Sequence, residues 1–284
     1  MIGTFCSVCS ISLLALGQLD FTMAAAIALV QALLPALLMN VCIVGLNQVF
    51  DISVDRINKP YLPLASGEWS LEVGIMVAAS TGGAALLAGW LSGSWPLMAT
   101  LAGSLALGIA YSTDLPFLRW KRYPLLAAGC ILSVRAVMVQ LGFFFHMKQA
   151  LGYPAVITRP LLFAMGFMLF FSIVIALFKD IPDVRGDRRE GIQTLSVRAG
   201  VSKVFWLCIT LLEVAYAGAI CACLLSSSVW WSRLMATAFH TAMGIVLYLR
   251  ARQTDMNDSS SIAACYMFVW KLFYAEYLFI PFLR

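Results

Sequence analysis

Long apolar runs separated by short polar connections dominate the pattern of this chain. A run of about 17–25 apolar residues is long enough to cross a bilayer as a helix. Nine such runs are present, at about 2–18, 24–46, 73–92, 95–112, 124–145, 160–178, 203–225, 230–249 and 261–282. The first is short and begins at the initiator methionine. The pattern predicts an all-α, polytopic membrane bundle of about nine transmembrane helices.

Composition supports a membrane protein. Of the 284 residues, 62% are hydrophobic and only 12% are charged, whereas about a quarter of a soluble globular protein is charged. A water-soluble fold of this length could not bury so much apolar surface. We therefore expect a single membrane domain over residues 1–284.

The basic residues fix the orientation of the nine predicted helices. With nine spans, the connections at 47–72, 113–123, 179–202 and 250–260 share one face. Thirteen of the nineteen Lys and Arg residues lie on that face, with Lys203 counted at the start of the seventh run. This bias matches the positive-inside rule. Eleven of the fourteen acidic residues lie on the same face. Since acids contribute little to orientation, the sequence indicates that carboxylates gather there for another reason.

The first group of these acids extends the second apolar run. It reads NQVFDISVD, so that Asn47, Asp51 and Asp55 are spaced by four residues. On a helix of 3.6 residues per turn these side chains drift by only about 80° around the axis. We predict one polar stripe at the membrane edge.

The second group follows the sixth apolar run and reads KDIPDVRGD. Asp180, Asp183 and Asp187 would share a face of a helix. Pro182 and Gly186 disfavour a regular helix there.

Paired aspartate groups suit a diphosphate held through magnesium. Mg²⁺ prefers oxygen ligands and usually binds one or two carboxylates together with substrate phosphates. Nearby basic residues would complete a clamp. These candidates are Lys59, Arg119, Lys121, Arg122, Lys179, Arg185 and Arg188. A neutralised allylic diphosphate is a good leaving group, and a hydrophobic bundle offers an apolar lodging for an isoprenoid tail.

Two other interpretations compete with this one. The acids could be solvated helix caps, or the chain could be a non-catalytic scaffold or an ion transporter. A transporter would favour isolated acids within the spans, where only Glu213 and Glu276 qualify. Arg135, inside the fifth run, is expected to face the bundle interior. It is a candidate diphosphate-binding residue, with a bond to a structural carbonyl as the alternative.

Longer motifs resemble a known family. The segments NQVFDISVDRINKPYLPLASGE and KDIPDVRGDRREGIQTLSVRAG resemble the paired aspartate motifs of the UbiA superfamily of intramembrane prenyltransferases. The stretches YSTDLPFLRWKR, SVRAVMVQLGFF and YMFVWKLFYAEYLFIP are similar to its plant and algal homogentisate branch. The resemblance covers nearly the whole chain. It implies nine helices around a central cavity, with both motifs capped by loops on one face.

The resemblance also implies roles for single residues. The magnesium–diphosphate ligands would be Asn47, Asp51, Asp55, Asp183 and Asp187, with Asp180 adjoining. Basic residues near the diphosphate would be Lys59, Lys121 and Arg122. Tyr111 would line the pocket.

The branch implies a reaction and a location. The acceptor would be homogentisate, prenylated with loss of CO₂, and the donor phytyl diphosphate, on the way to tocopherols in a plastid membrane. A homogentisate solanesyltransferase or a plant phenolic or flavonoid prenyltransferase remains an alternative. An Arg-Pro-His-Thr-like run, whose arginine helps frame the family's active site, is absent before Ile2, as is a plastid transit peptide. Either the chain is a shortened form or another residue replaces that arginine.

Overall fold

A computed structural model describes residues 1–17, 21–182, 184, 188, 194–225 and 230–283. All regular secondary structure within these ranges is helical. The chain divides into two compact units, Met1–Val156 and Ile157–Arg284. Asp183 and Asp187, predicted to bind metal, lie outside the described residues.

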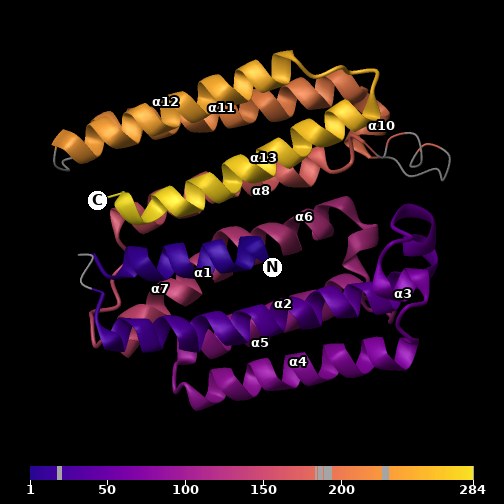
Figure 1. Cartoon of the computed structure of the whole chain (residues 1–284), viewed down its shortest axis with the longest axis horizontal. Coiled ribbons are helices and arrows are strands. Elements are labelled where there is room, and N and C mark those ends of the chain that lie inside the picture. The colour runs from indigo at the N-terminus through magenta and orange to yellow at the C-terminus, as the bar shows by residue number, and fades with distance from the viewer. Residues whose placement is uncertain (18–20, 183, 185–187, 189–193, 226–229, 284) are drawn as a thin grey trace. The chain divides into compact units, whose positions relative to one another are not determined.

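The first unit contains the N-terminal helices (Figure 1). They are α1 (Ile2–Ala15), α2 (Met23–Asn58), the short α3 (Pro63–Ser66), α4 (Leu71–Leu91), α5 (Trp95–Ser112), the 3₁₀ turn η1 (Trp120–Arg122), α6 (Pro124–Leu132), the π-helical turn η2 (Ser133–Met138) and α7 (Val139–Ala150). Helix α2 packs against α4 and α5, while α1 packs against α7. The fifth predicted run is thus three consecutive helical pieces, because a π turn interrupts it.

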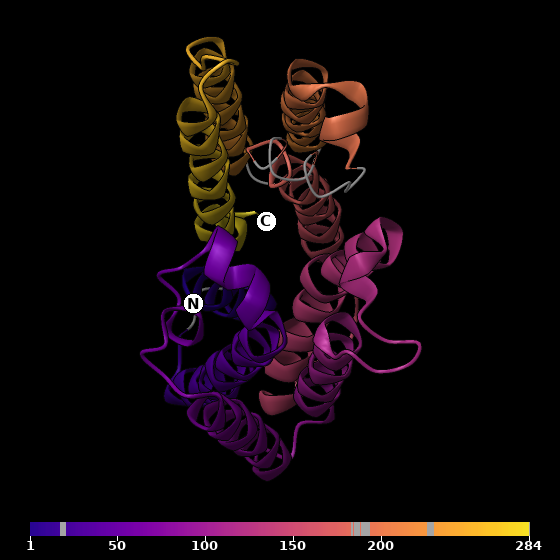
Figure 2. The ribbon, with the colours of Figure 1, turned by 90° about the vertical axis from the view of Figure 1, so that its right-hand side faces the viewer.

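The second unit contains the remaining helices. They are α8 (Arg159–Phe178), α10 (Leu195–Ala199), α11 (Val201–Leu225), α12 (Trp230–Arg252), α13 (Ser259–Phe279) and the 3₁₀ turn η3 (Ile280–Phe282). Helix α11 packs against α12 and α8, and α13 contacts both α8 and α12. Figure 2 looks along the helices and shows them nearly end-on.

Eight helical segments in the described ranges are long and apolar enough to cross a membrane. They correspond to the second to ninth predicted runs. The first run forms α1, which has only 14 residues and is shorter than a usual span. Helix α2 continues beyond the end of its apolar run at residue 46 to Asn58, so the first aspartate group is helical as predicted.

Polar side chains cap the N-termini of several of these helices. Thr22 accepts a hydrogen bond from the backbone N–H of Ala25 at 3.2 Å, and Ser70 accepts one from Val73 at 3.3 Å. Asp258 caps α13 by accepting from the backbone N–H groups of its first turn. Such caps satisfy amides that lack partners within the helix.

Small residues bring α4 close to its neighbours. Its buried positions are Gly74, Ala78, Gly82, Ala85 and Gly89. A Cβ added at Gly82 would lie 2.7 Å from Cys42 Sγ on α2. Because lipid tails are as apolar as the side chains, such close van der Waals packing drives helix association in membranes. It holds α2, with its aspartates, against the α4–α5 pair.

Aromatic side chains fill the second unit. Phe171 of α8 lies between Tyr216 of α11 and Phe273 of α13, with ring centroids 6.2 and 5.8 Å away. Phe178 of α8 stacks on Tyr266 of α13 at 5.5 Å. These contacts tie three helices together near the end of α8 that leads to the second aspartate group.

Candidate functional site

The first aspartate group lies on the last turns of α2, beyond the end of its apolar run. Asp51 has only 15% of its side chain exposed, and Asp55 is buried. Lys59 follows as the helix C-cap, with its backbone N–H donating to the Asp55 carbonyl at 2.7 Å. The helical spacing that the sequence predicted is therefore present in the structure.

The connection after α5 has an unusual backbone. Phe117 and Arg119 have φ values of 65° and 60°, a left-handed region that non-glycine residues rarely adopt. The Trp120 indole N–H donates to the Phe117 carbonyl at 2.8 Å and closes this turn. Strained backbone of this kind persists where the surrounding structure holds it, and it clusters at ligand-binding sites.

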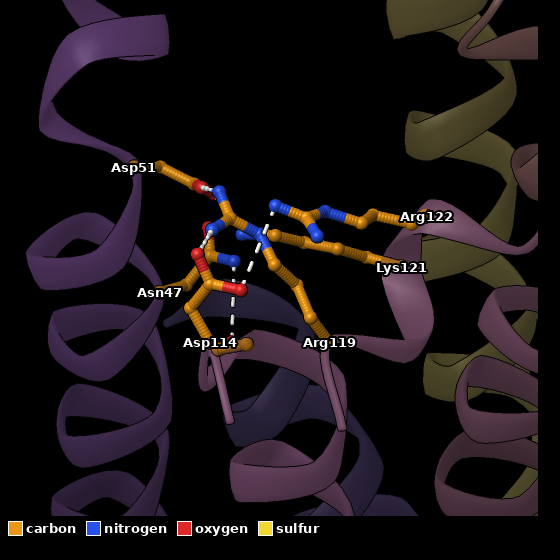
Figure 3. A network of polar contacts seen from close by, with 7 residues as sticks. Asn47, Asp51, Asp114, Arg119, Lys121 and Arg122 are labelled. Carbon is orange, nitrogen blue, oxygen red and sulfur yellow. Dashed lines mark hydrogen bonds and ion pairs between the residues drawn. The ribbon is translucent and has the colours of Figure 1, made fainter. Parts of the chain in front are cut away.

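This connection presents its basic side chains to Asp51 (Figure 3). Lys121 Nζ hydrogen-bonds to Asp51 Oδ2, and Arg119 Nη2 lies 3.5 Å from Asp51 Oδ1. Both basic side chains are only 16% exposed. Because both oxygens of the carboxylate are engaged, the partly buried Asp51 has its charge compensated within the unit.

A second carboxylate, Asp114, also pairs with the basic side chains of this connection. Asp114 pairs with Arg119 through Oδ2 and lies 3.5 Å from Arg122 Nη2 through Oδ1. Arg119 therefore bridges Asp51 and Asp114, while Arg122 contacts only the outer carboxylate of the two and is 60% exposed. The result is a network of alternating charges, which we call the basic-loop network: Asp51, Asp114, Arg119, Lys121 and Arg122.

The donor set on α2 fits a magnesium ion. Asn47 Nδ2 donates to Ser112 Oγ of α5 at 3.3 Å, so the amide oxygen is the Asn47 atom left for a cation. Asp51 and Asp55 add carboxylate oxygens on the same stripe. Within the described residues, no three His, Cys, Asp or Glu side chains cluster as a metal site. A metal here would therefore share substrate oxygens or further ligands.

The other predicted residues of the first unit have different surroundings. Tyr111 is half-buried on the last turn of α5, and Lys59 is exposed. Arg135 lies in the π-helical turn η2, where Gln140 Nε2 donates to its backbone carbonyl at 3.2 Å. π-helical turns are frequent at functional sites. Diphosphate binding by these residues stays a prediction.

The second aspartate group is described in part. Lys179 forms the C-cap of α8, and both Lys179 and Asp180 are half-buried. The Pro182 carbonyl accepts a hydrogen bond from Ser259 Oγ at 3.2 Å. This contact ties the chain after α8 to the beginning of α13.

Reasoning from the sequence missed two features. Asp114 was only one of many acids on the predicted face, and its DLPFLR spacing to Arg119 is the signal that could have marked it. Glu276 was predicted only to be an acid within a span, and its partner is His240 of α12, with His240 Nε2 3.4 Å from Glu276 Oε2. Both side chains are buried, in keeping with the high cost of a lone polar group at membrane depth.

Comparison with known proteins places these features in a family. The model of the UbiA prenyltransferase family matches residues 3–272. The chain is 49% identical to homogentisate phytyltransferase 1, chloroplastic, of Arabidopsis thaliana, over 100% of this chain and 72% of the relative. It is 48% identical to a homogentisate geranylgeranyltransferase of Hordeum vulgare, over 99% and 69% of the two chains.

A solved structure shows the same fold. A UbiA homologue from Archaeoglobus fulgidus, bound to GPP and Mg²⁺, matches with a TM-score of 0.63 and 14% identity, over 99% of this chain and 96% of that chain. The family match over most of the sequence and the plant relatives confirm the resemblance inferred from the aspartate motifs. This chain belongs to the UbiA prenyltransferase family, as a multi-pass membrane enzyme of aromatic prenyl transfer.

Proposed function

We propose that the protein transfers a phytyl group from phytyl diphosphate to homogentisate, with Mg²⁺, in the tocopherol pathway of a plastid membrane. One observation carries this proposal: a chain 49% identical throughout to a chloroplastic homogentisate phytyltransferase holds Asp51 beside two basic side chains. The solved homologue with GPP and Mg²⁺ supports the metal and the diphosphate.

The residues of the first unit suit the diphosphate end of the donor. Asn47, Asp51 and Asp55 would hold Mg²⁺, which neutralises diphosphate charge and makes it a better leaving group. Asp180, Asp183 and Asp187, the second aspartate group, are proposed as metal ligands by the same chemistry. Lys121 and Arg119 already lie beside Asp51 and would donate charge-assisted hydrogen bonds to phosphate oxygens.

The proposed reaction begins with departure of the diphosphate and ends with prenylation and decarboxylation of homogentisate. The bond between the allylic carbon and the diphosphate oxygen breaks, and pyrophosphate leaves with the electron pair. Basic residues stabilise the charge that develops on the leaving oxygen. The electron-rich ring of homogentisate attacks the allylic cation, and the attacked carbon loses its proton. The acetate arm releases CO₂ and gains a proton to become a methyl group.

A geranylgeranyl donor is the second candidate. Identity to the barley geranylgeranyltransferase is 48%, almost equal to that with the phytyltransferase. The two donors have equal chain length and differ in saturation. Residues at the diphosphate end therefore do not distinguish them, and the choice must lie along the apolar tail.

A panel of donors and acceptors tests the proposal. The full chain, purified in detergent, receives phytyl, geranylgeranyl or solanesyl diphosphate together with homogentisate or a flavonoid. We expect the highest kcat/KM for phytyl diphosphate with homogentisate, with release of pyrophosphate and CO₂. Asp51→Ala should abolish turnover. Preference for a flavonoid acceptor, or full activity of Asp51→Ala, would contradict the proposal, and absence of pyrophosphate release with every donor would favour a scaffold or a transporter.

A further inference from the structure

Asp114 is a carboxylate that the proposed reaction does not use. It is half-exposed and follows the end of α5 by two residues. Its two oxygens contact different basic side chains, Arg119 and Arg122. Neither the metal nor the diphosphate needs a carboxylate at this outer position, and an extra negative charge there would by itself repel an anionic substrate. The contacts of Asp114 therefore need another explanation.

The basic side chains of this loop would repel one another without a counter-charge. Arg119, Lys121 and Arg122 lie within four consecutive positions, and they point toward one region in Figure 3. Like charges gathered in one region repel one another and destabilise the fold. Asp51 compensates Lys121 and part of Arg119. When Asp51 turns to a metal, Asp114 is the remaining acidic partner of Arg119 in the network.

The backbone of Arg119 also depends on its side-chain contacts. Its φ of 60° is in the left-handed region, which a non-glycine residue keeps only where the surroundings hold it. Trp120 closes the turn on one side through its bond to the Phe117 carbonyl. On the side-chain end, Arg119 is held by the two carboxylates. Asp114 can therefore keep the Arg119 guanidinium in place after the guanidinium has separated from Asp51.

We propose that Asp114 is a positioning residue for diphosphate binding. It holds Arg119 and Arg122 together so that both can reach phosphate oxygens once Asp51 binds metal. This inference rests on the proposed function in taking a diphosphate as the ligand of the basic-loop network. Preorganisation of this kind strengthens binding because the side chains do not have to be gathered when the ligand arrives.

Calorimetric binding of magnesium pyrophosphate to the full chain in detergent tests the role of Asp114. Asp114→Asn removes the charge and keeps the shape, and should weaken binding about fivefold, as expected for loss of two partly exposed ion pairs. Asp114→Glu should recover most of this loss. Glu72→Gln, which removes an exposed acid on the same predicted face outside the network, should bind as the unsubstituted protein does.

The coupling to Arg119 distinguishes positioning from a general effect. In an Arg119→Ala background, Asp114→Asn should weaken pyrophosphate binding less than twofold, because its main partner is gone. In turnover, Asp114→Asn should raise the donor KM and leave the homogentisate KM unchanged. Equal losses in both backgrounds, unchanged binding, or tighter binding through release of a competing carboxylate would each overturn the inference.

Two failures can be told apart. If pyrophosphate binding depends on Asp114 but homogentisate is not prenylated, the proposed acceptor is wrong and the positioning role stands. If homogentisate is prenylated while pyrophosphate binding is indifferent to Asp114, the positioning role is wrong and the proposed function stands.

Discussion

Asp51→Asn should change two properties of the protein in opposite directions. The substitution keeps the shape of the side chain and removes the charge that engages Lys121 and Arg119. Turnover with Mg²⁺ should fall about 100-fold, since a loss of about 3 kcal/mol of charge stabilisation in the transition state has that effect. Binding of pyrophosphate without metal should become tighter, because two basic side chains lose their internal competitor.

The size of the second effect follows from the geometry. At the 3.5 Å that separates Arg119 Nη2 from Asp51 Oδ1, the attraction is about 5 kcal/mol at an effective dielectric constant of about 20. Desolvation, side-chain entropy and the remaining solvent exposure reduce the net value to about 1 kcal/mol for each pair. Releasing Lys121 and Arg119 together should therefore strengthen metal-free binding about 30-fold.

Titration calorimetry with pyrophosphate in EDTA measures this effect, and pyrophosphate release with phytyl diphosphate and homogentisate measures turnover. Glu72→Gln is the control, because it removes an acidic charge on the same predicted face without touching the basic-loop network. The tightening should weaken at high salt, which screens the interaction of pyrophosphate with the freed cations. Unchanged or weaker metal-free binding by Asp51→Asn would refute the view that Asp51 and a diphosphate compete for the same two side chains.

Three further predictions concern the metal, packing and a helix cap. Chelation by EDTA should abolish pyrophosphate release and added Mg²⁺ should restore it, whereas turnover that persists in EDTA would contradict a metal-dependent reaction. Gly142→Ala should lower the free energy of unfolding by about 1–3 kcal/mol, and with it Tm, because the new Cβ would overlap Thr100 Oγ1. That hydroxyl is held by a 2.8 Å hydrogen bond to the Pro96 carbonyl. An unchanged Tm in a thermal melt would show that Thr100 moves freely. The hydroxyl and backbone N–H of Ser260 hold the pKa of Asp258 below its ordinary value, so its cap should stabilise the fold at neutral pH and lose this contribution as the pH falls through that lowered pKa. The Tm difference between Asp258→Ala and the unsubstituted protein should shrink accordingly on acidification, and a difference that persists unchanged would argue against an ionised cap.

The apolar runs were informative because a bilayer imposes a minimum length on every crossing helix. Eight of the nine predicted runs match helices of sufficient length in the described chain. The run at 2–18 forms only the 14-residue α1, and length alone could not say how much of it is helical. The π-helical turn carrying Arg135 could not be predicted either, because a mostly apolar run has no clear helical period in which one extra residue would show.

The aspartate stripe could be predicted from the sequence because its residues are only four positions apart. Asn47, Asp51 and Asp55 follow the period of a helix, so an extension of α2 was enough to align them. The flanking motifs then identified the family, and the sequence comparisons confirmed it. Both conclusions depend on the order of residues along the chain.

The sequence by itself thus determined a membrane bundle, the aspartate stripe and the family, because periodicity and motif order are properties of neighbouring residues. Only the tertiary structure decided that Lys121 and Arg119 contact Asp51, that Asp114 holds Arg119, and that His240 is the partner of Glu276. The pairing with Asp51 joins positions about seventy residues apart. It depends on close packing of α2 with α5 and on a left-handed turn at Arg119, and neither leaves a periodic signal in the sequence.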